Sequence, residues 1–304
     1  MNGFLNVLKP PGMTSAAVVG YVKRMTGEKH VGHAGTLDPE AAGVLPVMLG
    51  RAARLFDYLV DKEKTYVAEC AFGAATDTQD ATGRVIETGT NYPTIEQVRE
   101  AAAHLVGDIE QRPSIYSAIK QDGKPLYERA RDGEQVEAPI RIVHVSSIDV
   151  HEETAEHGVR MTIRCGRGTY IRSICDDLGK LTGCPAHMRF LLRAQSGVFT
   201  LDTAMTLEEI AQHQQNGTLE LLPMDIGIGH MPRLDAPASL EKQVVNGVKL
   251  PIRALKGAEQ LQSGAAVRVY LRNRFWGIAA RENDDLSWRC VFPPDKEENY
   301  ANHP

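Results

Sequence analysis

Apolar and polar side chains alternate along Val159-Arg-Met-Thr-Ile-Arg-Cys165. After Gly166-Arg-Gly168 the spacing of the apolar residues changes, and this second, longer spacing continues up to Gly183. Such alternation is typical of a strand with one buried face and, here, one basic face. From Thr169 onward the apolar residues recur at helical spacing, and a glycine is a common helix terminator. The stretch therefore predicts a strand, a glycine turn and an amphipathic helix, in that order.

Similar local signals predict the elements on either side of this unit. Capping boxes and terminal glycines mark where helices begin and end, and a period of two marks strands. The expected elements are a helix over residues 14–27, capped by Thr14 or Ser15 and ended by Gly27; a strand over residues 65–72; a helix opened by the capping box of Thr94 and Gln97 and closed by Gly107; and a helix opened by the capping box of Thr206 and Glu209.

Residues 111–141 lack a sustained strand pattern and contain five glycines or prolines together with several basic side chains. We interpret this segment as a long exposed insertion that carries a short helix over residues 126–131. Insertions of this length in a compact domain are usually functional or disordered. We expect this one to become ordered on a substrate.

The chain of 304 residues is long enough for one large domain and one small domain. A glycine-rich run over residues 226–229 is followed by Pro232 and Pro237, which predicts a linker and a boundary near residue 230. Strands are expected over residues 266–271, 275–279 and 288–292. The predicted organisation is a mixed α/β domain over residues 1–229 and a small β-rich module over residues 230–304.

The composition, with 42% hydrophobic and 24% charged residues, is that of a soluble globular protein. No signal peptide and no apolar run of membrane-spanning length is present, so we expect a cytoplasmic protein. Five widely spaced cysteines form no CxxC pair, and we interpret them as reduced; Cys70, Cys165 and Cys175 are expected to be buried. The net charge is −5, but residues 160–193 hold seven basic and two acidic residues. This segment could bind an anionic substrate or could be a solvated surface.

The densest run of unusual residues is His33-Ala-Gly-Thr-Leu-Asp38-Pro-Glu-Ala-Ala-Gly43-Val-Leu-Pro-Val47. Because proline disfavours helical backbone in the residue before it, Asp38 is expected in an extended segment or a turn. Gly35 and Gly43 permit sharp turns or close backbone approach. From the residues alone, Asp38 is either a surface turn former or a buried carboxylate paired with a cation.

The sequence also resembles a known family, the TruB family of tRNA pseudouridine synthases, through six motifs in the same order between about residues 3 and 200. These motifs are Lys9-Pro-Pro-Gly-Met-Thr-Ser15; Gly32-His-Ala-Gly-Thr-Leu-Asp-Pro39 with its continuation to Val47; Lys64-Thr-Tyr66; residues 111–120 with Tyr116-Ser-Ala118; Gly168-Thr-Tyr-Ile-Arg-Ser173 followed by Asp177-Leu-Gly179; and residues 191–199. Two positions depart from the family pattern: Ser114 replaces a common second proline, and Ala194 replaces a common second arginine.

The resemblance implies a mostly antiparallel central sheet with flanking helices, followed by a PUA-like RNA-binding module. It also implies conversion of uridine 55 in the T loop of tRNA to pseudouridine, without a cofactor, after the base has been flipped out. Asp38 is the implied nucleophile, Arg172 the cation that pairs with it, and Tyr66 the ring that contacts the flipped base and later accepts a proton. Two other interpretations stay open: Arg172 could pair with Asp176 on its own helix, and Tyr66 could be a core residue.

Six residues are the implied substrate contacts. His33 is expected to support the flipped base, Tyr170 belongs to the arginine motif, and the basic residues are expected at RNA phosphates. These basic residues are Lys120, Lys124, Arg167 and Arg193. No metal is expected, because His30 and His33 are followed by no nearby third ligand. The implied partner is the T arm and loop of tRNA; no membrane and no obligate protein partner is expected.

Two rival functions remain at this level. The chain could act mainly as an RNA-folding helper, alone or in addition to the chemistry. Alternatively, Asp38 could be the nucleophile of a hydrolase that acts on a nucleotide or glycoside, although no second carboxylate stands at a recognisable spacing.

Overall fold

The computed structural model describes residues 1–59, 63–117, 119–121 and 123–293, apart from the side chain of Arg131. The chain divides into two compact units. The larger unit comprises residues 5–47 and 59–219, and the smaller one comprises residues 1–4, 48–58 and 220–304. The predicted division into domains over residues 1–229 and 230–304 stays a prediction.

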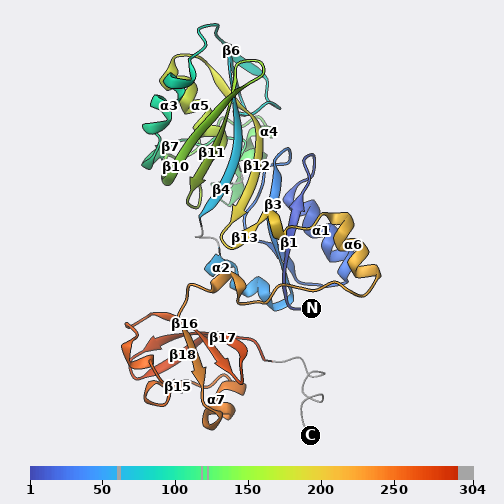
Figure 1. Cartoon of the computed structure of the whole chain (residues 1–304), viewed down its shortest axis with the longest axis vertical. Helices are drawn as coiled ribbons and strands as arrows, with labels where there is room; N and C mark the ends of the chain where they lie inside the picture. The colour runs from blue at the N-terminus through green and yellow to red at the C-terminus, as the bar shows by residue number, and fades with distance from the viewer. Residues whose placement is uncertain (60–62, 118, 122, 294–304) are drawn as a thin grey trace. The chain divides into compact units, whose positions relative to one another are not determined.

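A mostly antiparallel sheet forms the centre of the larger unit, as predicted (Figure 1). Its strand order is β1-β3-β12-β4-β11-β10-β7, with β2 beside β3 and β13 beside β12. The strands are β1 (Gly3–Lys9), β2 (Val31–His33), β3 (Ala42–Leu49), β4 (Lys64–Phe72), β7 (Gly107–Gln111), β10 (Arg141–Thr154), β11 (Gly158–Cys165), β12 (Ala186–Ser196) and β13 (Phe199–Thr200). Strands β3 and β12 pair in parallel, and this pairing brings the Asp38 segment beside a strand from much later in the chain.

Helices flank this sheet. Helices α3 (Ile95–Ala103) and α5 (Ile171–Thr182) pack on one face over the main core, and α1 (Ser15–Thr26) and α6 (Leu207–Gln215) lie beside β1 and β3 (Figure 1). The predicted caps are confirmed: Thr14 caps α1, Gly27 ends it at φ 68°, and both capping boxes form. The prediction that Gly107 closes α3 is wrong, because the helix ends at Ala103 and Gly107 begins β7.

The main core joins apolar residues of β4 and β11 to the inner faces of α3 and α5. The predicted alternation is confirmed on both strands: Tyr66, Ala68 and Cys70 of β4 are buried, and so is every second residue from Val159 to Cys165 on β11. All five cysteines are free and buried. Their thiols therefore act as small apolar groups.

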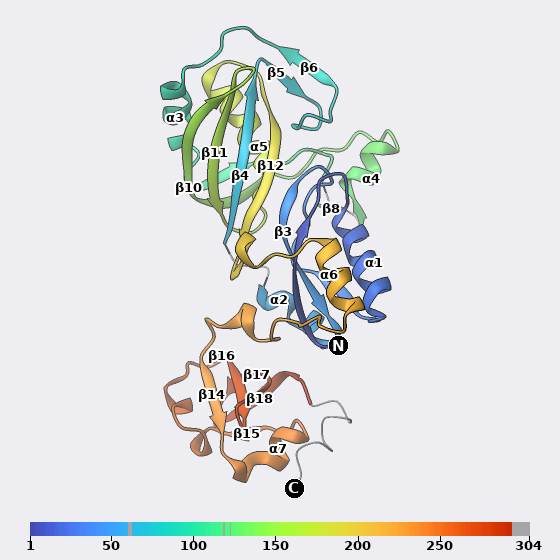
Figure 2. The same cartoon turned by 45° about the vertical axis from the view of Figure 1, so that its right-hand side comes forward.

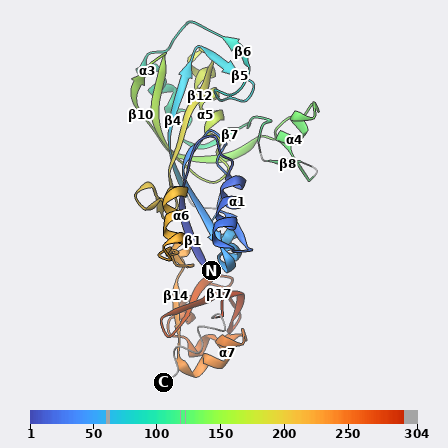
Figure 3. The same ribbon diagram turned by 90° about the vertical axis from the view of Figure 1, so that its right-hand side faces the viewer.

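Two hairpins and a short helix project from the sheet. Strands β5 (Ala74–Thr76) and β6 (Val85–Thr88) form one hairpin (Figure 2). Strands β8 (Lys120–Gln121) and β9 (Lys124–Pro125) form the other and lead into α4 (Leu126–Arg131). This second group stands away from the sheet (Figure 3), and it confirms the predicted insertion with its helix. Ala118, which belongs to one of the quoted motifs, lies outside the described residues.

The smaller unit is β-rich, as predicted. Its sheet has the order β14-β16-β17-β18-β15, formed by β14 (Arg233–Ala236), β15 (Leu250–Pro251), β16 (Ala266–Leu271), β17 (Arg274–Glu282) and β18 (Asp285–Val291). Helix α7 (Glu241–Val245) covers part of its core, and the short helix α2 (Phe56–Leu59) lies between β3 and β4 in the chain. In the part of the chain that the structure describes, no helix combines the length and the apolar character needed to cross a membrane.

Candidate active site

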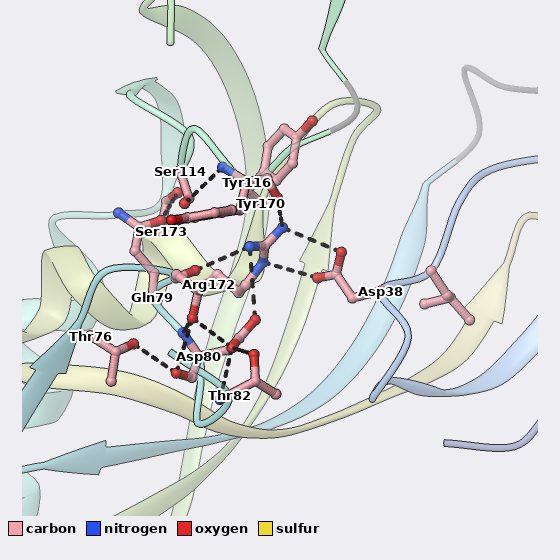
Figure 4. A network of polar contacts seen from close by, with 12 residues as sticks. Asp38, Thr76, Gln79, Asp80, Thr82, Ser114, Tyr116, Tyr170, Arg172 and Ser173 are labelled. Atoms are coloured by element: carbon pink, nitrogen blue, oxygen red, sulfur yellow. Dashed lines mark hydrogen bonds and ion pairs between the residues drawn. The ribbon is translucent and has the colours of Figure 1, made fainter. Parts of the chain in front are cut away.

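The central feature of the site is an ion pair between Asp38 and Arg172 (Figure 4). Arg172 Nε lies 2.9 Å from Asp38 Oδ2, and Arg172 Nη2 donates a hydrogen bond of 3.3 Å to Asp38 Oδ1. The arginine side chain is 5% exposed, whereas the aspartate side chain is 35% exposed. The carboxylate is therefore held from the protein side and remains open to an incoming group on the other side.

The alternative pairing of Arg172 within its own helix is wrong. Asp176 instead contacts Lys180, with 2.7 Å between Asp176 Oδ2 and Lys180 Nζ, and it accepts a hydrogen bond from Gln79. The long-range interpretation of Asp38 as a carboxylate paired with a cation is the one that the geometry bears out.

Three acceptors besides Asp38 surround the Arg172 guanidinium. Its Nη1 donates to the carbonyl of Thr78 at 3.1 Å and lies 3.8 Å from Asp80 Oδ2, and its Nη2 donates to the carbonyl of Tyr116 at 3.2 Å. A planar guanidinium with five donors fits such a fork of acceptors, and a lysine ammonium does not. Arg172 is therefore held rigidly between two loops and the aspartate.

Asp80 is a second carboxylate at this arginine, and the sequence reasoning missed it. Its Oδ1 accepts hydrogen bonds from the hydroxyls of Thr78 and Thr82, at 2.8 and 2.6 Å, and from the Thr82 amide. Such local bonds are typical of an aspartate that shapes a turn. In the sequence Asp80 stands in a polar run after β4, a pattern that indicates only a loop, and no local signal shows that this loop reaches Arg172.

The N-terminus of α5 is clamped to the start of the insertion. The buried side chain of Gln111 accepts a hydrogen bond from the Tyr170 amide at 2.7 Å and donates one to the Tyr170 carbonyl at 3.0 Å. Ser173 donates to the carbonyl of Arg112 at 3.4 Å. These contacts position the first turn of the helix that carries Arg172.

Asp38 lies in the loop between β2 and β3, directly before a turn. The Ala41 amide donates to the Asp38 carbonyl at 3.1 Å, so Asp38 precedes a short turn through Pro39 as the Asp-Pro step predicts. Gly43 follows at φ 116°, and a Cβ on it would lie only 2.3 Å from the Arg193 carbonyl. The predicted close backbone approach at Gly43 is confirmed, because β3 meets β12 at this position.

Arg193 does not act as the predicted phosphate contact. It is 0% exposed, and its guanidinium donates to the carbonyls of Val44 at 2.7 Å, Gly35 at 3.1 Å and Thr36 at 3.4 Å. A side chain whose donors are occupied inside the protein cannot reach a phosphate. Arg193 instead holds the loop that leads to Asp38.

Lys9 holds the other end of this loop. Its ammonium donates to the carbonyls of Pro10 and Pro39, each at 2.8 Å, and to the carbonyl of Met13. Burial lowers the pKa of Lys9 to about 8, against the attraction of the Glu40 and Asp38 carboxylates. The motif that begins at Lys9 therefore has a structural role, because its lysine holds the loop that carries Asp38. No local pattern in the sequence indicated this role.

Tyr66 and His33 lie near this loop in different surroundings. Tyr66 is buried in the main core, opposite Arg193 in the pairing of β4 with β12, and burial raises the pKa of its hydroxyl. His33 is the last residue of β2; burial, and secondarily the nearby Arg193 charge, lower the pKa of its imidazole. Its Nδ1 is buried and has no hydrogen-bond partner among the described residues. At neutral pH the tyrosine is a phenol and the histidine is uncharged.

The remaining predicted contacts are spread over the edge of the site. Arg167 is exposed in the turn before α5, and Lys120 is exposed on β8. Lys124 on β9 is exposed but engaged, with its ammonium 2.6 Å from Asp132 Oδ2. Tyr170 packs against the small apolar cluster of the insertion. No group of three or more potential metal ligands is found within the described ranges.

We expect Lys9→Met to lower the free energy of unfolding of the larger unit by about 2–4 kcal/mol, because three carbonyls lose the donor that a buried lysine supplies. Circular dichroism in the far ultraviolet during urea unfolding would measure this loss. Tryptophan fluorescence would not, since Trp276 and Trp288 both belong to the smaller unit. Lys23→Met, at an exposed lysine of α1, is the matched control and should change stability by less than about 0.5 kcal/mol.

The lowered pKa of Lys9 predicts a pH dependence with a definite sign. Between about pH 8 and 10.5 the unfolded chain keeps a proton on Lys9 that the folded chain has lost, so the stability contributed by this residue rises with pH. We expect the unfolding free energy of the native protein minus that of Lys9→Met to grow by about 2 kcal/mol from about pH 7.5 to 9.5. Subtracting the variant removes the titration of groups common to both. A difference that stays flat or falls would contradict the assignment.

Two family models match adjacent parts of the chain. "TruB family pseudouridylate synthase (N terminal domain)" matches residues 23–171, and "tRNA pseudouridylate synthase B C-terminal domain" matches residues 172–227. The tRNA pseudouridine synthase B of Alkaliphilus oremlandii (strain OhILAs) is 41% identical over 294 residues, which cover 96% of this chain and 97% of that protein. The tRNA pseudouridine synthase B of Bacillus subtilis (strain 168) is 41% identical over 258 residues, which cover 82% and 84%.

Solved structures show the same architecture. A chain of the "Crystal Structure of a Cbf5-Nop10-Gar1 Complex" matches with a TM-score of 0.72 and 25% identity, over 96% of this chain and 85% of that one. A chain of the "Structure of H/ACA RNP bound to a substrate RNA containing 2'-deoxyuridine" matches with a TM-score of 0.73 and 23% identity, over 97% and 86%, and shares the fold. The fold is that of a pseudouridine synthase with a PUA-like C-terminal module. The chain belongs to the TruB family of pseudouridylate synthases.

Proposed function

We propose that this protein is a tRNA pseudouridine synthase that isomerises uridine 55 in the T loop. The reaction breaks the bond between uracil N1 and ribose C1′, turns the base and joins C5 to C1′. The hydrogen on C5 is lost and N1 gains one, so atoms and electrons balance without a redox partner. We further propose that the protein is a cytoplasmic enzyme that acts on the T arm of tRNA and needs no obligate protein partner.

The observation that carries the proposal is the partly exposed carboxylate of Asp38 on the buried guanidinium of Arg172. A nucleophile must be both available to the substrate and oriented, and this pair combines the two. In our proposal Asp38 acts on the nucleoside, and Arg172 orients it and balances its charge. The low exposure of Arg172 means that bound RNA would remove most of the remaining water from the pair.

Tyr66 and His33 have supporting roles in this proposal. Tyr66 is only 7% exposed, so in our proposal a small part of its side chain contacts the flipped base. The raised pKa of its hydroxyl keeps it a phenol, which can accept a proton only while releasing its own. The Nδ1 of His33 is buried without a hydrogen-bond partner among the described residues, so in our proposal the neutral imidazole supports the flipped base through the rest of its ring. Neither role requires a charged side chain.

The target uridine must leave its stack before Asp38 can reach it, at a cost of a few kcal/mol. Contacts to the RNA backbone can offset this cost. We assign these contacts to Lys120, Lys124 and Arg167, together with packing against Tyr170, and we remove Arg193 from the set because it is buried. Recognition by the shape of a folded loop, with few base-specific contacts, suits this arrangement.

The test is to incubate the purified protein with an unmodified tRNA transcript and to map pseudouridine along the product. We expect a single pseudouridine at position 55. A hydrolase would instead leave an abasic or cleaved RNA. An RNA-folding helper without chemistry would leave the uridine unchanged while it still bound the transcript.

A further inference from the structure

One hydroxyl group holds the residue immediately before Asp38. Ser15 Oγ accepts a hydrogen bond of 2.9 Å from the Leu37 amide and lies 3.1 Å from the Leu37 carbonyl, to which it donates. Ser15 is the first residue of α1 and is only 2% exposed, so water does not compete for these bonds. A single side chain thus satisfies both polar groups of one backbone residue.

This contact bears directly on the position of the Asp38 carboxylate. The Leu37 side chain is buried in the main core, so Leu37 is held both through its side chain and through its backbone. Only the Leu37–Asp38 peptide separates this anchor from the Cα of Asp38. A shift of Leu37 would therefore move the carboxylate relative to Arg172, which is held independently from the opposite side by Thr78 and Tyr116.

The neighbouring hydroxyl has a different task. Thr14 Oγ1 accepts a hydrogen bond of 3.0 Å from the Ala17 amide and so caps α1. Removal of such a cap typically costs about 1 kcal/mol of stability. Thr14 and Ser15 thus form a natural pair of adjacent hydroxyls, one of which serves the helix and the other the loop that carries Asp38.

We propose that Ser15 is a positioning residue for the reaction: it sets the Asp38 carboxylate against Arg172 by fixing the backbone of Leu37. This inference rests on the proposed function, because positioning matters only if Asp38 acts on a substrate. Ser15 itself touches no reacting atom. Its loss should therefore slow the chemical step and leave RNA binding unchanged.

The test compares Ser15→Ala with Thr14→Ala and the native protein. Misplacement of a catalytic group by about 1 Å can cost on the order of 10²-fold in rate. We therefore expect Ser15→Ala to lower kcat for pseudouridine formation by roughly 10- to 100-fold with KM within about twofold. Thr14→Ala should lower thermal stability about as much as Ser15→Ala does, but its kcat should stay within about twofold of the native value. Ser15→Thr, which retains the hydroxyl, should recover most of the activity and guards against a general packing defect.

A second measurement does not depend on activity. Hydrogen–deuterium exchange of a peptide that covers residues 36–41 should accelerate in Ser15→Ala and stay near the native rate in Thr14→Ala, because only the former frees the Leu37 amide. Native kcat in Ser15→Ala, or an equal kcat loss in Thr14→Ala, would overturn the inference. If the native protein forms no pseudouridine, the proposed function fails, and the exchange data still decide whether Ser15 holds the loop.

Discussion

Asp38→Asn is expected to abolish pseudouridine formation, lowering kcat by at least about 10³-fold. The amide has nearly the same shape as the carboxylate but carries no charge, so both the nucleophile and the ion pair with Arg172 are lost. The variant should still fold, because Asp38 is partly exposed and its loop is held by Lys9, Ser15 and Arg193. Affinity for tRNA should stay within a few-fold of native.

Single-turnover mapping of pseudouridine, together with filter binding of labelled tRNA, would measure both quantities on one preparation. Asp202→Asn, at an exposed aspartate outside the site, is the matched control and should leave rate and affinity unchanged. If Asp38→Asn keeps even a tenth of the native rate, Asp38 is not the nucleophile. If it loses binding and rate together, its role is mainly to hold RNA.

Arg172→Lys is the second substitution with a large expected effect. A lysine ammonium cannot reach Asp38, Thr78 and Tyr116 at once, so it would leave part-buried carbonyls unpaired and the carboxylate poorly oriented. We expect kcat to fall by about 10²- to 10³-fold and the free energy of unfolding by about 2–4 kcal/mol. The fall in kcat should be larger than any rise in KM.

Thermal melts and single-turnover rates below the melting temperature separate the two effects. Arg164→Lys, at an exposed position of β11, controls for the conservative exchange. A variant that is destabilised as expected but retains native kcat would show that Arg172 has only a structural role. A variant that keeps native stability but has lost its rate would show that Arg172 acts mainly by orienting Asp38.

The sequence predicted elements well where the signal is local. The capping boxes at Thr94 and Thr206 fix helix starts within a few residues, and burial alternates over residues 64–70 of β4 and 159–165 of β11. Strands β10 and β12 were not recognised. Both contain register shifts, such as the one between Met188 and Phe190, and each shift moves the side chains that follow to the opposite face. A period of two is lost when such interruptions are frequent.

The site was predictable only in part, because its contacts join distant segments. The resemblance to a family named Asp38 and Arg172, which lie 134 positions apart, and the structure brings them together. Nothing local distinguished the buried Arg193 from a surface arginine, or showed that Asp80 faces Arg172.

The surface charge of the basic segment over residues 160–193 could not be predicted from the local sequence either. Acidic partners elsewhere in the fold neutralise much of its charge: Arg189 pairs with Glu69 and Glu156, and Arg160 pairs with Glu152. A local excess of positive charge in the sequence is therefore not a positive surface in the folded protein. Only pairing in three dimensions decides which basic side chains remain for RNA.

The hydrogen bond from Arg172 to the Tyr116 carbonyl joins the insertion over residues 111–141 to the guanidinium that pairs with Asp38. A buried guanidinium that loses one acceptor is left with an unpaired donor, which costs roughly 1–3 kcal/mol of stability. Displacement of the insertion would therefore also weaken the position of the Asp38 carboxylate. If Asp38 is the proposed nucleophile, its orientation therefore depends in part on the insertion being in place.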